Sequence, residues 1–566
     1  MRKRSGILPL AAAAAGLAFW LLARTDDPIP TAGRPEWAAP GAFSRVGSDH
    51  AELETLFALI RTTLRENQAA FRTSSGFVRG FSAGAAYPQI WIRDAATIIP
   101  AARFFYGTPY LRTAVIEYLA RQKPNGEIED WFDGAGKAGK NTTESDQEAS
   151  SVLAAGQITE LIGAAWLQRK VNGTAVLGRL ENALTFVVRE RFDRSLGLVK
   201  GAHTIDWGDV EMEEPDQRAI RIGSDSHWTA GIYNQSQFYA ACLELADLWR
   251  ASGSPARAAP WAERAAAVKA AADRLLWQES RGFYRVHVHI TPLSHAFDED
   301  AMFALGGNAE AILSGLASSE KARRIFAAAS SRRKEFGVST ISGALLPPYP
   351  RGTFSHPMVD DPFEYQNGGQ WDWFGGKLVL GMFREGEAAE AAGELLAIAG
   401  KNASRRGLFE WDAPDGAGRG SSRFSGSAGS LARALIEGYF GIGISGDGLI
   451  LSPRLGADSG AVHMYLPSAG RFIGYDQTFD EESLALSITY ASDWMEAGIL
   501  RILWPGRDKS GQPLALPGRF DIRRDGAAIP YRLEKIGEDA YIRVETDWKR
   551  HSLRIRPDPG AAIKQR

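Results

Sequence analysis

The sequence predicts a mainly α-helical fold, a toroid of about twelve paired helices, followed by a C-terminal β-sandwich. Alanine-rich segments with apolar residues at helical spacing fill most of the chain up to residue 445. Short strand-like segments separated by turn residues fill the remainder. Hydrophobic residues make up 45% and charged residues 23% of the 566 residues, which is typical of a globular protein and excludes disorder as the main state.

Residues 1–24 have the pattern of a secretory signal or membrane anchor. The basic residues 2–4 precede an apolar run over residues 7–23 that is long enough to span a bilayer as a helix. Leu21 stands where cleavage after residue 23 would require a small residue, so we favour an uncleaved anchor over a removed signal. The basic flank predicts that the rest of the chain is exported to the periplasmic or extracellular side. Residues 25–45 contain four prolines and are expected to form an extended tether.

Residues 46–445 are predicted to form the helical toroid. In the segment 229–251, Ile232, Tyr239, Leu243 and Ala246 recur with the period of a helix. Loops rich in Gly, Trp and Asp separate the helix pairs and are expected to carry function. The predicted helices cover residues 48–71, 94–106, 109–122, 146–168, 175–191, 229–251, 256–276, 298–314, 317–330, 370–384, 386–402 and 426–440.

Residues 446–566 are predicted to form the β-sandwich, which we expect to pack against the helical part. Turn residues such as Asp525-Gly526 separate short apolar segments. The predicted strands cover residues 448–455, 462–466, 484–490, 500–504, 520–523, 541–544 and 552–555.

The composition argues against several classes of function. Lys and Arg total 65 against 67 for Asp and Glu, so no basic excess is present for nucleic-acid binding. Cys242 is the only cysteine, which excludes an internal disulfide and cysteine-rich metal sites. His287 and His289 share one face of a predicted strand, but no third ligand is nearby in the sequence. We therefore predict neither a metal site nor an organic cofactor.

The loops between the predicted helices combine carboxylates with tryptophans. Arg93 and Asp94 follow Trp91 directly before a helix, where they can grip adjacent sugar hydroxyls beside an aromatic wall. Capping of the helix by Asp94 is the structural alternative. The same combination recurs at Asp130 and Trp131 in the next acidic loop.

A second group of acids lies in the middle of the chain. Asp146 stands at a helix start, where it also suits the helix dipole. Asp206, Trp207 and Asp209 lie in a loop with many acids, and Asp225 follows shortly after. A solvated acidic loop is the alternative here, but solvated loops rarely contain Trp.

The segment 364–373 is the most distinctive in the chain. Two glycines between Asn367 and Gln370 permit close approach of the backbone to a ligand, and Trp371 follows directly. Further along, Glu410 stands between two aromatic residues, where the pKa or orientation of its carboxylate can be tuned. Such loop carboxylates suit glycoside hydrolysis, which requires one protonated carboxyl to act on the leaving oxygen and one ionised carboxylate.

Three motifs resemble those of the six-hairpin glycosidases, a superfamily that includes glucoamylases, processing α-glucosidase I, neutral invertases and kojibiose phosphorylases. Residues 91–94 (Trp-Ile-Arg-Asp) resemble the W-x-R-D motif, and residues 367–371 (Asn-Gly-Gly-Gln-Trp) resemble the N-G-G-x-W motif. Residues 437–442 (Glu-Gly-Tyr-Phe-Gly-Ile) are similar to the segment that closes the barrel before a β-domain. The resemblance covers roughly residues 50–450 in the order of elements and implies an (α/α)6 barrel.

The resemblance also implies roles for individual residues. Glu410 corresponds to the general base, and the general acid lies in the loop after the middle helix pair. Asp209 is the first choice for the acid, Asp206 the second, and Asp225 stays open, because this loop departs from the W-E-E pattern of glucoamylases. The residues expected to bind the sugar are Trp91, Arg93, Asp94, Asp130, Trp131, Asp146, Trp207, Asn367, Gln370 and Trp371.

The sequence therefore predicts an exported glycoside hydrolase, anchored through residues 7–23, that cleaves an α-linked oligosaccharide or glycan with inversion. In that mechanism the carboxyl groups of Asp209 and Glu410 stand about 6.5–9.5 Å apart. The alternatives are an inverting disaccharide phosphorylase, with an anion site near His227 and Arg423, and a non-catalytic glycan-binding surface protein.

Overall fold

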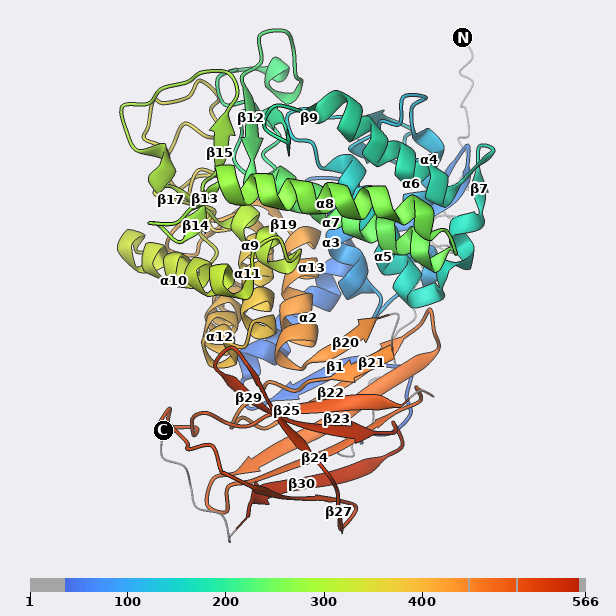
Figure 1. Cartoon of the computed structure of the whole chain (residues 1–566), viewed down its shortest axis with the longest axis vertical. Helices are drawn as coiled ribbons and strands as arrows, with labels where there is room; N and C mark the ends of the chain where they lie inside the picture. Colours follow the sequence, from blue (N-terminus) through green and yellow to red (C-terminus); the bar gives the residue numbers. More distant parts are fainter. Residues whose placement is uncertain (1–35, 446–447, 495–496, 559–566) are drawn as a thin grey trace, which may run out of the picture.

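The computed structural model describes residues 36–445, 448–494 and 497–558 (Figure 1). The predicted signal or anchor over residues 1–24 lies outside these ranges, as does the first half of the predicted tether. Within the described ranges, the search for a helix of sufficient length and apolarity to cross a bilayer found none.

Twelve α-helices lie between residues 51 and 433 of the described chain, at or close to the predicted positions. They are α2 (Ala51–Glu66), α3 (Ile92–Ala102), α4 (Thr108–Arg121), α5 (Gln147–Ile162), α6 (Val176–Phe186), α7 (Ile232–Ala251), α8 (Pro255–Leu275), α9 (Leu305–Leu313), α10 (Ser319–Phe336), α11 (Asp372–Arg384), α12 (Ala388–Arg405) and α13 (Ser425–Arg433).

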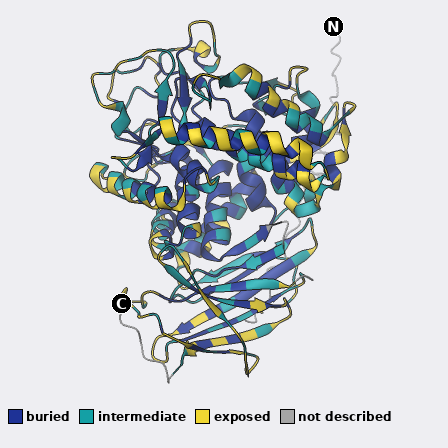
Figure 2. Cartoon of the chain, in the orientation of Figure 1, coloured by how far each residue is buried: buried dark blue, intermediate teal, exposed yellow. Residues whose placement is uncertain are grey.

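The helices form two concentric rings. Helix α3 contacts α5, and the contacts continue through α7, α9, α11 and α13 back to α3, so that these six helices close into an inner ring. The helices between them in the sequence pack on the outside of this ring. The outer helix α8 shows an exposed stripe toward solvent (Figure 2), whereas most residues of its inner partner α7 are buried. This arrangement agrees with the helical toroid expected from the sequence.

Two helices are shorter than predicted because strand pairing competes with them. The first helix ends at Glu66, since β2 (Gln68–Thr73) turns back on β3 (Gly76–Phe81) as a hairpin. Helix α9 begins only at Leu305, because β16 (Phe303–Ala304) pairs with β17 (Leu345–Leu346) directly before it.

Further short strands lie in the loops between the helices. They are β4 (Ile90–Trp91), β5 (Trp131–Phe132), β6 (Ala138–Gly139), β7 (Lys170–Val171), β8 (Thr174–Ala175), β9 (Phe192–Asp193), β10 (Leu198–Val199), β11 (Gly201–Ala202), β12 (Trp228–Gly231), β13 (Trp277–Gln278), β14 (Phe283–Tyr284), β15 (His287–His289), β18 (Phe409–Asp412) and β19 (Gly418–Ser422).

The C-terminal domain consists of two sheets beneath the helical rings (Figure 1). One has the strand order β1-β22-β23-β24-β30-β26-β27 and the other β20-β21-β25-β29-β28. All their pairings are antiparallel except the pair β21 and β25. The strands are β1 (Arg45–Ser48), β20 (Ile442–Ser445), β21 (Gly448–Leu451), β22 (Gly460–Leu466), β23 (Arg471–Asp480), β24 (Ala485–Ser492), β25 (Gly498–Leu503), β26 (Phe520–Arg524), β27 (Ala527–Ala528), β28 (Arg532–Ile536), β29 (Asp539–Thr546) and β30 (His551–Pro557).

The segment before the first helix belongs to this domain in space. Strand β1 pairs with β22, with Arg45 opposite His463. Ala38, which falls within the predicted tether, packs against Phe472 and Ala491 of the same sheet. The chain therefore enters the helical rings from the C-terminal sheet and returns to it after α13.

Candidate active site

A buried arginine at the start of α3 gathers four carboxyl groups from three loops. The Arg93 Nε donates a hydrogen bond to Asp146 at 2.7 Å, and its Nη2 donates to Glu144 at 2.7 Å. The carboxylates of Asp130 and Asp209 lie 3.7 and 3.6 Å from the same nitrogen. We call these five residues the Arg93 cluster. It joins α3 to the loops before β5, before α5 and between β11 and β12.

The Arg93 cluster has more acids than its single cation can balance. Burial raises the pKa values of Asp130 and Glu144 well above the usual range, although Arg93 opposes the shift. Burial likewise raises the pKa of Asp209, against the influence of Arg93 and a hydrogen bond from Asn141. Burial therefore favours the protonated forms of Asp130, Glu144 and Asp209, because one guanidinium offsets only part of the cost of removing these charges from water.

Glu410 lies on β18 with both carboxylate oxygens held by donors. The Tyr87 hydroxyl lies 3.2 and 3.1 Å from the two oxygens, and the backbone N–H of Ser421 donates to one of them at 2.8 Å. Gly420 has φ +62°, and a Cβ there would collide with the Glu410 carboxylate, so only glycine fits beside it. Burial raises the pKa of Glu410 to about 7, opposed by the two donors and increased by the charge of Asp209.

The charges of Asp209 and Glu410 raise the pKa values of the same two neighbouring groups, Asp94 and Tyr365. Burial raises the pKa of Asp94 to about 7; Arg93 lowers it, and the charges of Asp209 and Glu410 raise it further. Burial also raises the pKa of Tyr365, and the same two carboxylates contribute next. The structure thus brings an acid from the middle of the chain and one from the end of the helical part to a single site.

Unpaired polar atoms gather at this site. Buried polar atoms almost always have a hydrogen-bond partner, so a group of them without one within the described part of the chain indicates a place for a polar ligand. The Trp91 and Trp131 rings pack together beside them, with centroids 6.3 Å apart. The unpaired atoms are Trp91 Nε1, Asp94 Oδ1, Asp130 Oδ1 and Oδ2, Trp207 Nε1 and Asp209 Oδ1.

Three residues predicted to bind sugar use their polar groups within the protein. Asn367 exchanges hydrogen bonds with the backbone of the loop over residues 349–361. Gln370 accepts from the backbone and hydroxyl of Thr340 and donates to the backbone that follows β18. The buried Trp371 donates its indole N–H to a carbonyl of its own segment. In this structure these side chains hold the loops around Glu410 together.

The alternative acids of the middle loop are placed differently from Asp209. Asp206 accepts hydrogen bonds from the backbone N–H groups of Gly306 and Gly307 at 2.9 and 2.8 Å, where α9 begins. Burial raises its pKa to about 7 despite these two donors. Asp225 is exposed. Asp209 is thus the one of the three that lies beside Arg93.

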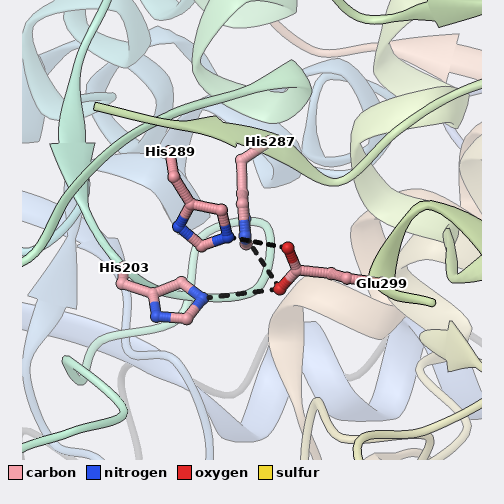
Figure 3. A group of neighbouring side chains, drawn as sticks. All are labelled: His203, His287, His289 and Glu299. Carbon is pink, nitrogen blue, oxygen red and sulfur yellow. Dashed lines mark hydrogen bonds and ion pairs between the residues drawn. The ribbon is translucent and has the colours of Figure 1, made fainter. Parts of the chain in front are cut away.

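A second polar cluster escaped the sequence analysis. His287 and His289 on β15 lie close to His203, which follows β11, and to Glu299 in the turn before β16 (Figure 3). His203 precedes β15 by more than 80 residues, so no spacing in the sequence reveals the group. Its signal is structural, since β11, β12 and β15 form one small sheet.

The sequence model of the mannosylglycerate hydrolase MGH1-like glycoside hydrolase domain matches residues 87–425, more than half of the chain. The matched span contains the Arg93 cluster and Glu410. The chain belongs to this family. It is a glycoside hydrolase, and its predicted membership of the six-hairpin glycosidases is confirmed.

Solved structures of two α-L-rhamnosidases share the fold of this family member. The α-L-rhamnosidase from Dictyoglumus thermophilum superposes with a TM-score of 0.60 at 12% identity, over 92% of this chain and 51% of that enzyme. The Streptomyces avermitilis α-L-rhamnosidase complexed with L-rhamnose gives 0.55 at 13%, over 91% and 42%. A GH63 mannosylglycerate hydrolase from Thermus thermophilus in complex with glucose gives 0.47 at 17%, over 67% and 99%.

The chain thus spans about half the length of these rhamnosidases, and the likeness concerns the fold alone. A search of curated protein sequences found no match.

Proposed function

We propose that this glycosidase is an exported, inverting enzyme with an (α/α)6 barrel that cleaves an α-linked gluco- or manno-configured substrate. Asp209 donates a proton to the glycosidic oxygen as the bond to the anomeric carbon breaks. Glu410 removes a proton from the water that attacks that carbon from the opposite face. The observation that carries the proposal is the pair itself, two carboxyls from distant loops whose charges act on the same neighbours, Asp94 and Tyr365.

Exposure supports Asp209 as the proton donor. The side chains of Asp130, Glu144 and Asp146 are 0% exposed, whereas that of Asp209 is 23% exposed. Only Asp209 of the Arg93 cluster can therefore touch a substrate and solvent. Its raised pKa favours the protonated form that a proton donor requires.

The two donors on Glu410 support its role as the base. A hydrogen bond to a carboxylate favours the ionised form, and Tyr87 and Ser421 both donate to it. With a pKa of about 7, Glu410 is roughly half ionised at neutral pH, so it can accept a proton from water and release it between turnovers.

The remaining polar groups support a sugar on the buried side of the scissile bond. Asp94 presents an unpaired oxygen, and Trp91 presents an unpaired indole N–H beside its packed ring. Carboxylates accept hydrogen bonds from sugar hydroxyls, and aromatic rings cover the apolar face of the sugar. The family name refers to mannosylglycerate, so α-mannosides of small carboxylic acids belong among the first substrates to test.

The test is hydrolysis of a panel of α- and β-glycosides by the full chain, with Asp209→Asn and Glu410→Gln beside the wild type. We expect one class of α-glycoside to be cleaved, with the β-anomer formed first as seen by proton NMR. Each substitution should lower kcat by at least about 10³-fold. Asp225→Asn, an exposed acid close in sequence, is the matched control and should leave kcat unchanged.

Glycosyl fluorides separate the two roles. Fluoride leaves without protonation, so Asp209→Asn should retain most of its activity on the α-glycosyl fluoride, whereas Glu410→Gln should stay inactive. First formation of the α-anomer would contradict inversion. Release of a sugar phosphate only in the presence of phosphate would favour the phosphorylase alternative.

Export rests on the basic residues 2–4 and the apolar run over residues 7–23. Fractionation of expressing cells should recover the activity in the envelope fraction. Protease added to spheroplasts should digest the barrel. Activity confined to the cytosolic fraction would contradict it.

A further inference from the structure

Five of the nine histidines in the chain lie together beside the loop that carries Asp209. His203, His227, His287, His289 and His295 form a continuous set of ring contacts, with centroids between 4.7 and 6.5 Å apart. His287 and His289 lie on β15, His203 directly follows β11, His227 directly precedes β12, and His295 lies in the loop after β15. His287 and His289 alternate along β15 and so face the same side, and the backbone N–H of His203 bonds to the carbonyl of His227.

The carboxylate of Glu299 stands at the centre of this set (Figure 3). Its oxygens lie 3.9 Å from His203 Nε2, 3.4 Å from His287 Nε2 and 2.7 Å from His289 Nε2. One ligand atom from each of these four residues lies within 4.8 Å of the others. Tetrahedral coordination at about 2.0–2.1 Å brings ligand atoms to about 3.4 Å from one another, so side-chain rotations of modest size complete the geometry.

The charges of this set leave room for a cation. Each ion pair of Glu299 within the described chain is with a histidine rather than with Lys or Arg. His203 and His287 are 0% and 4% exposed, and His203 Nε2 and His287 Nδ1 are buried without a hydrogen-bond partner among the described residues. A half-buried carboxylate and unpaired ring nitrogens together make a donor set that a metal ion satisfies.

We propose that His203, His287, His289 and Glu299 bind one divalent transition-metal ion. Imidazole nitrogens with a single carboxylate suit Zn²⁺, which accepts four such ligands in a tetrahedral site. Ca²⁺ and Mg²⁺ prefer oxygen ligands and do not match this set.

The neighbours of the four ligands orient them as metal sites require. His203 Nδ1 contacts the Glu213 carboxylate, which leaves Nε2 free to bind the metal. His289 Nδ1 lies 2.9 Å from His227 Nε2, so its Nε2 is the nitrogen that faces Glu299 and the proposed metal. The Tyr349 hydroxyl donates to Glu299 at 2.6 Å. Carboxylate–histidine pairs of the kind formed by Glu213 and His203 fix the tautomer and raise the basicity of the ligand.

The role of this ion is structural, because four protein ligands leave no coordination position for substrate. It joins the start of the loop that carries Asp209 to β15 and to the turn before α9. His203 stands six residues before Asp209, and Asp206 between them binds the start of α9. The metal and α9 together hold this loop from two sides.

Metal binding to the full chain, expressed without a polyhistidine tag, tests the inference. The protein is stripped with EDTA, dialysed and titrated with Zn²⁺ by calorimetry, and its metal content is measured by mass spectrometry. We expect one zinc ion per chain and a rise in Tm on zinc addition. Co²⁺ in place of zinc should give the intense visible absorption of a tetrahedral site.

Substitutions locate the site independently of hydrolysis. Glu299→Gln keeps the size of the side chain and should weaken zinc binding by at least 100-fold, and Glu213→Gln should weaken it by about 10–100-fold. His551→Gln changes a histidine of the C-terminal domain that contacts Asp525 and Asp547, and should leave zinc binding unchanged. Circular dichroism checks that each variant is folded.

Two results would overturn the inference. One is a wild-type chain that binds none of Zn²⁺, Co²⁺ or Ni²⁺ at micromolar concentration. The other is a folded Glu213→Gln or Glu299→Gln variant with the zinc affinity of the wild type. Neither result depends on the glycosidase assay, so the metal site and the proposed catalytic pair are tested separately.

Discussion

The two ends of the loop segment over residues 203–209 balance buried charge in opposite ways. At Asp209, four carboxyl groups surround one permanent cation, Arg93. At His203, one carboxylate, Glu299, is surrounded by imidazoles whose charge depends on protonation or on a metal. The difference shows that one short loop segment connects a site built around a fixed cation to one whose positive charge depends on the histidines or on the proposed metal ion.

Asp206, midway along the loop, is balanced in a third way. Its carboxyl has backbone N–H groups at the start of α9 as partners, and its pKa is raised to about 7 by burial. Three residues of one loop segment thus have different partners, which are a fixed guanidinium for Asp209, the start of a helix for Asp206 and the histidine cluster with its proposed metal for His203. Each responds differently to substitution and to pH.

Removing the fixed cation should have the largest effect. Arg93→Met leaves the carboxyl groups of Asp130, Glu144 and Asp146 buried beside an apolar side chain. Breaking a buried ion pair by removing one partner costs about 3–5 kcal/mol, so we expect a loss of that size in the free energy of unfolding at pH 7. Urea unfolding measures it.

The pH dependence of this loss identifies its cause. The raised pKa values of Asp130 and Glu144 mean that these carboxyls carry less negative charge at pH 4 than at pH 7, so the penalty of Arg93→Met should shrink at pH 4. Arg93→Lys, the matched control, keeps a cation, so its free energy of unfolding at pH 7 should fall by less than that of Arg93→Met. If the Met and Lys variants lost the same free energy of unfolding at both pH values, the loss would come from packing rather than from charge.

Asp206→Asn should separate desolvation from hydrogen bonding at the start of α9. A carboxyl whose folded pKa is raised from 3.8 to about 7 stabilises the fold below the lower value, and this contribution is lost as pH rises to the upper one. The asparagine variant, which does not titrate, should therefore gain about 1–4 kcal/mol relative to wild type between pH 4 and pH 8. Thermal unfolding across this range measures the difference. A change of the opposite sign would mean that the backbone donors outweigh desolvation.

Gln370→Ala should affect stability more than catalysis. The substitution leaves the buried N–H of Thr340 without its acceptor, which costs about 1–3 kcal/mol. We expect KM for the substrate to stay within about twofold of wild type. A large rise in KM with unchanged stability would instead assign Gln370 to sugar binding, as the sequence motif predicts.

Tyr87→Phe should produce the smallest effect, a shift in the pH profile. The Tyr87 hydroxyl donates to the Glu410 carboxylate and lowers its pKa. Without this donor the pKa rises above about 7, and the acidic limb of kcat/KM moves to higher pH by about 0.4–1 unit. An unchanged limb would show that Glu410 is not the group that must be ionised.

The helices were predictable because apolar residues recur along them at the spacing of a helix. The segment 229–251, for example, becomes helix α7 over Ile232–Ala251. Strand β23 (Arg471–Asp480) was missed, although it is the longest strand of the larger sheet. Its glycine and acidic residues interrupt the alternation that marks a strand.

The site was predictable where chemistry is local in the sequence. Arg93, Asp94 and Asp130 stand beside tryptophans at the borders of helices, so their type and position indicated a polar site. Asn367 and Gln370 show the limit of this reasoning, because an amide that binds a loop carbonyl and one that binds a sugar look the same in a sequence. His203 shows a second limit, since the strands that bring it to β15 are only two to four residues long and have no detectable period.

The pairing of β1 with β22 has a consequence for the order of events during translation. Strand β1 is made before the first helix, but its partner follows more than 400 residues later. At about 5–20 residues per second, β1 waits roughly 20–80 s on the ribosome before it can pair. The helical rings are completed during that time, so the last strands to be synthesised seal the first one, and a nascent chain arrested before residue 460 still presents β1 as an open edge.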